Sequence, residues 1–216
     1  MAQFTLGFLY EKGQGTAVDF KQAADWYRRA AERGNAAAQT NLGSLYERGQ
    51  GVVQDNRQAV NWYQRAADQG TIEAQFNLGR MYQTGQGMAQ DFAQAASWFR
   101  KAGEKGHIGA QSMLGLMHET GQGVARNYKQ AVDWYRKAAE AGDSRAQFDL
   151  GRIYETGQEA LTMDYVEAHK WWTIAESNGE DRARRSRIFV ERLMTPEQIV
   201  QARQRADDWI KAHAKQ

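Results

Sequence analysis

Apolar residues recur along the chain at the spacing that buries one side of a helix. Between Ala38 and Gly49 they stand at Ala38, Leu42, Leu45 and Tyr46, the i, i+4, i+7, i+8 pattern of an amphipathic helix. Between Asn56 and Gln69 they stand at Ala59, Trp62, Tyr63, Ala66 and Ala67, again on one helical face. The pattern predicts two consecutive amphipathic helices, which we name helix A and helix B.

This helix pair repeats with a period of 36 residues. One series consists of Leu-Gly pairs at Leu6-Gly7, Leu42-Gly43, Leu78-Gly79, Leu114-Gly115 and Leu150-Gly151. A second consists of aromatic pairs at Trp26-Tyr27, Trp62-Tyr63, Trp98-Phe99, Trp134-Tyr135 and Trp171-Trp172, of which the last arrives one residue late. The sequence therefore predicts five repeats within residues 1–180, at about 2–35, 36–71, 72–107, 108–143 and 144–180, with one inserted residue in the fifth.

Glycines and polar residues mark the junctions between helices. Helix A ends at a loop such as Gly49-Gln50-Gly51, where glycine can adopt the left-handed conformation that terminates a helix. In the fifth repeat, Glu159 replaces the second loop glycine. An N-cap residue precedes each helix B and is followed three residues later by Gln or Glu, at Asp19 and Gln22, Asp55 and Gln58, Asp91 and Gln94, Asn127 and Gln130, and Asp164 and Glu167. These pairs predict a capping box at the start of every helix B.

Small residues face large ones where neighbouring helices would meet. Gly43 and Ala38 on helix A leave room for the ring of a helix B residue such as Trp62 or Tyr63. We therefore interpret the aromatic pairs as packing residues rather than as a cofactor site. His118 stands where the other repeats have tyrosine, and we expect it to pack in the same place.

The two ends of the array differ. Each repeat buries its apolar face only against the next, so the ends need caps, and we predict capping helices over residues 181–216. Asp181 to Met194 is predicted to be one helix, and Thr195 and Pro196 supply the N-cap and first residue of another. The N-terminal end shows no comparable cap, which leaves Phe4, Leu6, Phe8 and Leu9 as candidates for exposure.

The composition is typical of a soluble globular protein, with 42% hydrophobic and 25% charged residues. A formal net charge of +2 argues against nucleic acid as a partner, and the absence of cysteine excludes disulfides and thiolate metal sites. No window holds the roughly 18 consecutive apolar residues of a membrane span. The compartment is undetermined: a removed upstream signal would make the chain periplasmic or secreted, and otherwise we expect it in the cytoplasm.

The sequence contains no arrangement typical of an active site. The four histidines, His107, His118, His169 and His213, share no ligand or catalytic motif, and no H-E-x-x-H, Walker or G-x-S-x-G pattern occurs. The Gly-x-Gly loops lack the preceding strand and the Lys-Ser/Thr of a P-loop. We therefore expect no enzymatic activity, no cofactor and no metal site.

The densest basic run lies just after the last repeat, at Arg182, Arg184, Arg185 and Arg187. Because Asp181 and Glu191 lie nearby, we interpret the run as a solvated helix face. Contact with phosphate or with an anionic membrane is the alternative.

The recurring elements Ala38-Gln39, Leu42-Gly43, Gly49-Gln50-Gly51 and Trp62-Tyr63 resemble those of the Sel-one-like repeat family, relatives of tetratricopeptide repeats. The resemblance covers residues 2 to about 180. It implies an all-α, right-handed superhelical solenoid and a role as an adaptor of protein complexes, often in bacterial envelope, secretion or host-interaction settings. Some relatives staple each repeat with a disulfide, and penicillin binding is attributed to them. This chain has no cysteine, so a hydrolase or penicillin-binding protein is the least favoured alternative.

The five helices A contain constant and variable positions. If Ala38 is counted as the first, positions 1, 5, 8 and 9 are constant and share the packed face, whereas positions 3, 7 and 11 vary. Mapped through the shared Leu-Gly pair, the variable positions match those that line the concave groove of tetratricopeptide repeats. We therefore predict partner-binding residues at Ser44, Arg48, Phe76, Arg80, Thr84, Leu116, Phe148 and Arg152.

These residues define a hypothesis of function. Arg80 and Arg152 would bind carboxylates of an extended or helical protein segment, while Phe76 and Phe148 would pack on its side chains. In the alternative, position 3 is partly buried against a neighbouring helix A, and positions 7 and 11 are only solvated. We predict a non-enzymatic scaffold for a protein or peptide. A self-associating module, dimeric through its N-terminal repeat, is the alternative.

Overall fold

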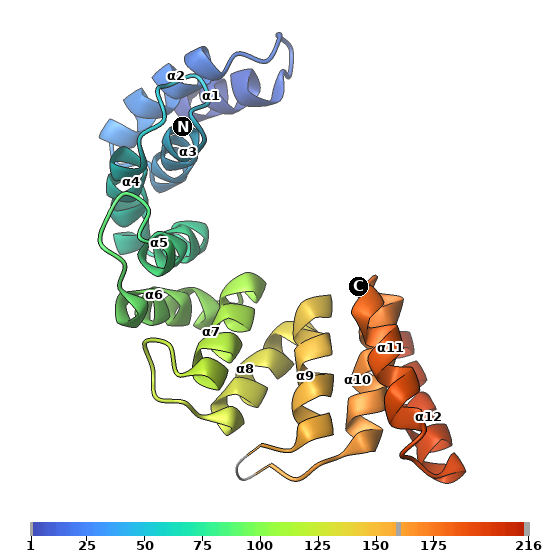
Figure 1. The fold of residues 1–216 in the computed structure, drawn as a ribbon. Helices are drawn as coiled ribbons and strands as arrows, with labels where there is room; N and C mark the ends of the chain where they lie inside the picture. Colours follow the sequence, from blue (N-terminus) through green and yellow to red (C-terminus); the bar gives the residue numbers. More distant parts are fainter. Residues whose placement is uncertain (1, 159–160, 214–216) are drawn as a thin grey trace. The chain divides into compact units, whose positions relative to one another are not determined.

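The computed structural model describes residues 2–158 and 161–213, which contain twelve helices and no strand (Figure 1). These residues form two compact units, one up to His107 and one from Ile108 onward. The N-terminal unit contains α1 (Ala2–Lys12), α2 (Phe20–Glu32), α3 (Ala36–Arg48), α4 (Asn56–Asp68), α5 (Ile72–Thr84) and α6 (Phe92–Glu104). The C-terminal unit contains α7 (Ile108–Thr120), α8 (Tyr128–Glu140), α9 (Ser144–Thr156), α10 (Tyr165–Ser177), α11 (Asp181–Glu191) and α12 (Pro196–His213).

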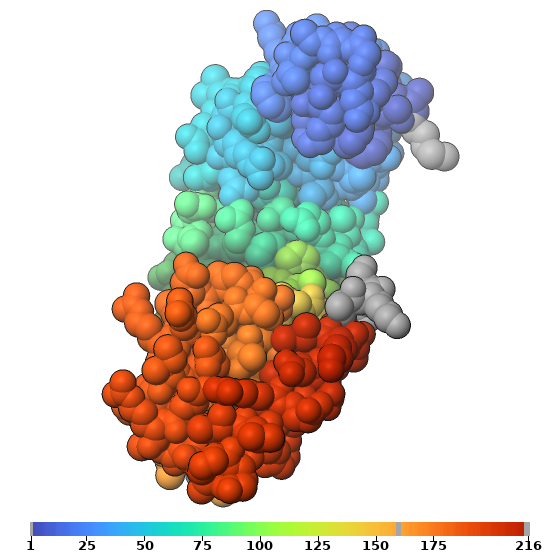
Figure 2. All heavy atoms as spheres, turned by 90° about the vertical axis from the view of Figure 1, so that its right-hand side faces the viewer, coloured from blue at the N-terminus to red at the C-terminus, as the bar shows by residue number. Residues whose placement is uncertain are grey.

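Each unit is a series of helix pairs in chain order. The odd-numbered helices from α1 to α9 are the predicted helices A, and the even-numbered helices from α2 to α10 are the predicted helices B. In the N-terminal unit, α2 to α5 each pack against both chain neighbours, so that the three pairs form successive layers (Figure 2). In the C-terminal unit, α10 packs against α9 and is covered by α11 and α12.

The glycine of each Leu-Gly pair lets helix B approach helix A closely. A Cβ on Gly43 would lie 2.9 Å from Cδ1 of Tyr63, well inside van der Waals contact. The same overlap would occur in the other four repeats, at Gly7 with Tyr27, Gly79 with Phe99, Gly115 with Tyr135 and Gly151 with Trp172. The predicted accommodation of a ring by glycine is confirmed, and the second aromatic residue of each pair is the one in contact.

The predicted starts of the five helices B are confirmed. At each start the N-cap side chain accepts a hydrogen bond from the backbone N–H of the third helical residue, at 2.9–3.0 Å. In the other half of a capping box, the Gln or Glu side chain would accept from the backbone N–H of the N-cap residue. Here the backbone N–H of each N-cap residue donates instead to a backbone carbonyl of helix A. Asp55, for example, donates to Tyr46 at 3.0 Å. The Gln or Glu side chain is therefore not needed to satisfy this N–H.

The second loop glycine has a role that the pattern did not reveal. Gly51 has a φ of 71°, and a Cβ there would lie 2.2 Å from the carbonyl carbon of Phe20, the first residue of α2. In the next repeat, a Cβ on Gly87 would lie 2.4 Å from the carbonyl oxygen of Asn56, the first residue of α4. Each of these loops therefore lies directly on the preceding helix B. Glu159 lies outside the described residues.

Buried glutamines join successive repeats. Nε2 of Gln39 donates to the carbonyl of Ala31 at 3.0 Å, and Nε2 of Gln75 donates to Ala67 at 3.2 Å. In the C-terminal unit, Gln147 donates to the carbonyl eight residues earlier in the same way, at 2.9 Å. Each bond links a helix A to the last turn of the helix B before it, whose carbonyls lack partners within the helix.

The C-terminal cap departs from prediction at one point. The first capping helix ends at Glu191 and not at Met194, because the backbone there tightens into bonds of the i to i−3 type, such as that from the N–H of Leu193 to the carbonyl of Val190 at 2.9 Å. Thr195 precedes Pro196 and therefore favours an extended conformation. The second helix begins with a complete capping box, in which Thr195 and Gln198 exchange bonds of 2.9 and 3.3 Å.

The N-terminal end is exposed in part. Leu6 is 37% exposed, as predicted, whereas Phe4, Phe8 and Leu9 are half-buried. The rings of Phe4 and Tyr27 lie 5.7 Å apart, and Phe4 and Phe8 belong to the core that surrounds Tyr27. The predicted exposure is therefore confirmed for Leu6 only.

Candidate functional site

The aromatic residues of the predicted partner face are half-buried against their own unit. Phe76 stacks on His107 with ring centroids 4.1 Å apart. The ring centroids of Phe148 and Trp172 lie 6.4 Å apart. Cζ of the Arg182 guanidinium lies 4.5 Å from the centroid of the Phe148 ring. Only part of each ring is therefore exposed.

Arg80 lies in a hydrogen-bonded group that we name the Tyr63 cluster, comprising Tyr63, Glu47 and Arg80. Nη2 of Arg80 donates to Oε1 of Glu47 at 2.6 Å, and the hydroxyl of Tyr63 donates to Oε2 of the same carboxylate at 2.7 Å. Glu47 lies on α3, Tyr63 on α4 and Arg80 on α5, so the carboxylate of Glu47 links three helices. The side chain of Arg80 remains 39% exposed.

Arg152 lies in a matching group, the Tyr135 cluster, comprising Tyr135, Glu119, Arg152 and Asp149. Nη2 of Arg152 donates to Oε1 of Glu119 at 2.5 Å, and the hydroxyl of Tyr135 donates to Oε2 at 3.0 Å. Nε of Arg152 also lies 3.5 Å from Oδ1 of Asp149. Arg152 thus faces two internal carboxylates, whereas Arg80 is paired with one.

Burial changes the protonation behaviour of both clusters. It raises the pKa of Tyr63 far above its ordinary value, and the charge of Glu47 adds to the effect. It raises the pKa of Tyr135 as well, reinforced by Asp149 and Glu119. Both hydroxyls therefore stay protonated and act as hydrogen-bond donors near neutral pH. Burial also raises the pKa of Asp149, because the charged form is poorly solvated there.

The other predicted residues are less engaged. Leu116 packs against the core of the C-terminal unit, and Ser44 is half-buried. Arg48 is exposed. Thr84 is also exposed, and its hydroxyl donates to the carbonyl of Arg80 at 2.9 Å. Among the predicted residues, the structure brings Arg80 and Thr84 together on one turn of α5.

Residues that complete the clusters were missed by the hydrophobic pattern. Position 10 of helix A carries Glu47 and Glu119 in the two repeats that precede Arg80 and Arg152, whereas Gln83 precedes Leu116. The paired residues are 33 positions apart. A comparison of position 10 with position 7 of the following repeat would have found both pairs.

The basic run after the last repeat is partly neutralised. Arg187 binds Glu176 and Glu191 at 2.9 Å each, and Arg182 binds Glu180 at 2.7 Å. Glu191 also accepts from Arg203 at 3.1 Å and contacts the fully buried ring of His169 at 2.8 Å. The bonds of Arg187 to Glu176 and of Glu191 to His169 link α11 to α10, and the bond of Glu191 to Arg203 links α11 to α12.

Within residues 2–158 and 161–213, no group of three or more His, Cys, Asp or Glu side chains is placed to hold a metal ion. In the same part of the chain, no helix combines the length and the apolar character needed to cross a membrane.

The repeats match a known protein family. The Sel1 repeat model matches residues 1–35, 36–71, 72–107, 108–143 and 144–180. A search of curated protein sequences found no match.

Solved structures share both sequence and fold with the chain. A protective antigen of uropathogenic Escherichia coli with an SLR fold is 32% identical, with a TM-score of 0.85, and the match covers 99% of this chain and 45% of that one. A Sel1 repeat protein from Oxalobacter formigenes is 31% identical, with a TM-score of 0.79, over 99% of this chain and 86% of that one. An immunity protein from Pseudomonas aeruginosa is 21% identical, with a TM-score of 0.52, over 99% and 80%, and shows a likeness of fold alone. The chain thus spans about 45% of the length of the E. coli relative.

Proposed function

The chain belongs to the Sel1 repeat family, and from this premise we propose that it is a non-enzymatic scaffold that binds a protein or peptide on the exposed part of its helices A. Sel1 repeat proteins generally act as scaffolds for protein–protein interaction. The observation that carries the proposal is the Tyr63 cluster, which holds a guanidinium in a defined position on a helix A.

Arg80 is suited to bind a carboxylate of the partner. Its contact with Glu47 engages Nη2, and a guanidinium has five N–H donors arranged as a fork. Glu47 is itself fixed by Tyr63, so the guanidinium loses little conformational freedom on binding. A partner carboxylate would therefore meet a preorganised cation. This arrangement favours an acidic protein segment as the partner.

Arg152 should contribute less than Arg80. Glu119 and Asp149 carry two negative charges beside its single positive charge when both carboxyls are ionised. A third carboxylate at this position would be repelled by the other two. The Tyr63 cluster, with one acid and one base, has no such excess of negative charge.

The partly exposed rings extend the polar anchor. Phe76 lies one turn before Arg80 on α5, and its stacking on His107 leaves part of the ring exposed. An apolar side chain of the partner, placed next to its acidic residue, would contact that ring. Phe148 and Arg152 repeat this spacing on α9.

Affinity capture from the source organism tests the proposal. The immobilised chain is compared with the double variant Arg80→Glu, Arg152→Glu, and captured proteins are identified by mass spectrometry. A control, Arg57→Glu with Arg100→Glu, changes the net charge equally on exposed positions of α4 and α6. We expect the first variant to lose the partner and the control to keep it. Equal capture by both would show that the helix A face is not the binding surface.

Self-association is the second candidate function, favoured by the exposed Leu6 on α1. In this case the molar mass in solution, measured by light scattering, would be twice that of the chain. The variant Leu6→Asp would return it to that of a monomer. A monomeric mass for the unchanged chain would remove this candidate.

A further inference from the structure

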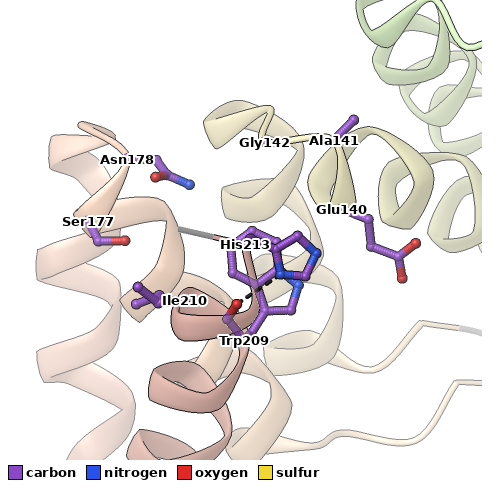
Figure 3. Close-up of a pocket in the computed structure, with 8 residues that line it drawn as sticks. All are labelled: Glu140, Ala141, Gly142, Ser177, Asn178, Trp209, Ile210 and His213. Carbon is purple, nitrogen blue, oxygen red and sulfur yellow. Dashed lines mark hydrogen bonds between the residues drawn. The ribbon is translucent and has the colours of Figure 1, made fainter. Parts of the chain in front are cut away.

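A cavity of about 370 Å³ lies in the C-terminal unit, away from the helix A face (Figure 3). Glu140 and Gly142 line it from the end of α8, and Asn178 lines it from the end of α10. Trp209 and His213 of α12 form its remaining wall, and their rings stack with centroids 3.9 Å apart. Figure 3 shows these two rings between the ends of α8 and α10. The cavity is therefore bounded by two helix C-termini and one aromatic surface.

The N-terminal unit has a lysine at the position equivalent to Asn178. Gly70 follows the C-cap of α4, and Lys105 is the C-cap of α6. Nζ of Lys105 donates to the carbonyl oxygen of Gly70 at 2.8 Å. The equivalent of Gly70 after α8 is Gly142, two periods later. The equivalent of Lys105 after α10 is Asn178, when the inserted residue is counted.

Asn178 does not replace the missing ammonium group. Its side-chain amide donates to Oε1 of Gln147 at 2.9 Å and is directed to a different acceptor from that of Lys105. In the N-terminal unit a cation therefore binds at the equivalent carbonyl, and in the C-terminal unit a cavity lies there.

The charge of the cavity favours a cation. The C-terminus of a helix carries partial negative charge, and two such ends, those of α8 and α10, border the cavity. Glu140 adds a full negative charge from an exposed position. The ring of Trp209 offers a further surface to which cations are attracted.

The histidine adds an acceptor. Nδ1 of His213 lies 2.8 Å from the carbonyl oxygen of Trp209, and because a carbonyl only accepts, Nδ1 must carry the hydrogen. In the neutral ring Nε2 is then an acceptor and not a donor. The carboxylate of Glu140 and, in the neutral ring, Nε2 of His213 therefore offer acceptors around the cavity.

We propose that this cavity binds an alkylammonium or guanidinium group, as the equivalent position of the N-terminal unit binds the side chain of Lys105. The volume accommodates such a head group with its methylene stem. The source of the group is either a Lys or Arg side chain of a partner protein or a free organic cation. The site is separate from the helix A face and does not depend on the function proposed above.

NMR titration of the complete chain tests the site. Methylguanidinium and n-butylammonium are added to ¹⁵N-labelled protein, and the indole signal of Trp209 is followed, with n-butanol as the neutral probe. For so small a ligand we expect saturable shifts with a Kd of about 1 mM for the cations. Equal shifts with n-butanol would overturn the proposal, because an apolar pocket would not distinguish charge.

Two variants complete the test. Asn178→Lys introduces the ammonium found in the N-terminal unit and should weaken binding of both cations at least about tenfold. Glu140→Gln, at an exposed position, should weaken binding about threefold. Unchanged affinity in both variants would show that the cations bind elsewhere.

A peptide arm distinguishes the two sources. A Gly-Ser peptide with one central Arg is compared with the same peptide carrying citrulline, its neutral counterpart. Shifts with the Arg peptide alone assign the site to a protein side chain. Shifts with methylguanidinium but with neither peptide assign it to a free cation. No shift with any cationic probe overturns the proposal.

Discussion

The substitution Gly115→Ala tests whether the glycine of helix A sets the position of the Tyr135 cluster. A Cβ on Gly115 would lie 2.5 Å from Cδ1 and 2.7 Å from Cε1 of Tyr135, whereas ordinary contacts begin near 3.4 Å. The ring would therefore have to move by about 1 Å, within a core where it is 1% exposed. Its hydroxyl donates to Glu119 at 3.0 Å, and this bond would be stretched by the same movement.

The expected cost follows from opposing terms. Overpacking of a core costs about 1–3 kcal/mol, and weakening a hydrogen bond to a charged group adds about 1 kcal/mol. Replacing glycine by alanine inside a helix returns about 1 kcal/mol. The net loss should be on the order of 2 kcal/mol, measured as the change in the free energy of unfolding by urea titration and circular dichroism.

The ring is identified as the obstacle by repeating the substitution in two backgrounds. In Tyr135→Phe the ring remains, so Gly115→Ala should still destabilise the protein. In Tyr135→Leu the ring is absent, and the same change should be neutral or stabilise by up to about 1 kcal/mol. An equal loss in all three backgrounds would refute the reasoning, because the cost would not depend on the ring.

Four further outcomes are expected. Gly51→Ala should cost several-fold more than Gly34→Ala in urea unfolding, since both glycines have positive φ but only Gly51 lies against backbone; equal costs would contradict the close approach. Asp55→Ala should destabilise by about 1 kcal/mol through loss of its N-cap bonds, against an Asp68→Ala control near zero. Burial lowers the pKa of His169 below its ordinary value of 6.5, so the unfolded chain binds more protons than the folded chain below that pH. The thermal midpoint should therefore fall as the pH drops below about 6.5, and His169→Gln should remove this part of the profile. Burial alone would raise the pKa of Glu191, but bonds from His169 and Arg203 lower it to about 2, so a second loss should follow between pH 4.5 and 2, and a flat profile would refute both assignments.

The repeated features made the fold predictable from sequence. A Leu-Gly pair, a loop glycine and an N-cap each occur five times in phase, so a chance match at one repeat is corrected by the other four. Helix starts were accurate because Asp55 and its equivalents signal them with a specific side-chain bond. The reciprocal half of the capping box was wrong, because the competing acceptor, the carbonyl of Tyr46, lies on another helix.

The candidate sites were less predictable because they depend on contacts between repeats. The pairing of Arg80 with Glu47 joins different repeats, and periodicity within one helix carries no information about it. The cavity beside Gly142 is lined by the ends of α8 and α10 and by Trp209 and His213 of α12, which lies outside the repeats. The repeat pattern carries no information about where α12 packs, so only the packed structure shows this space.

The buried glutamines make the two junctions of the N-terminal unit interchangeable. Gln39 binds Ala31, and Gln75 binds Ala67, with donor and acceptor eight residues apart in both cases. Removing residues 36–71 would therefore set Gln75 against Ala31 with the same bond. It would also bring Arg80 to Glu11, at the separation of 33 residues that now joins it to Glu47. Genes that duplicate or lose one 36-residue segment would thus yield longer or shorter arrays whose junctions are already complementary, and each such event would add, remove or relocate a charged cluster on the surface.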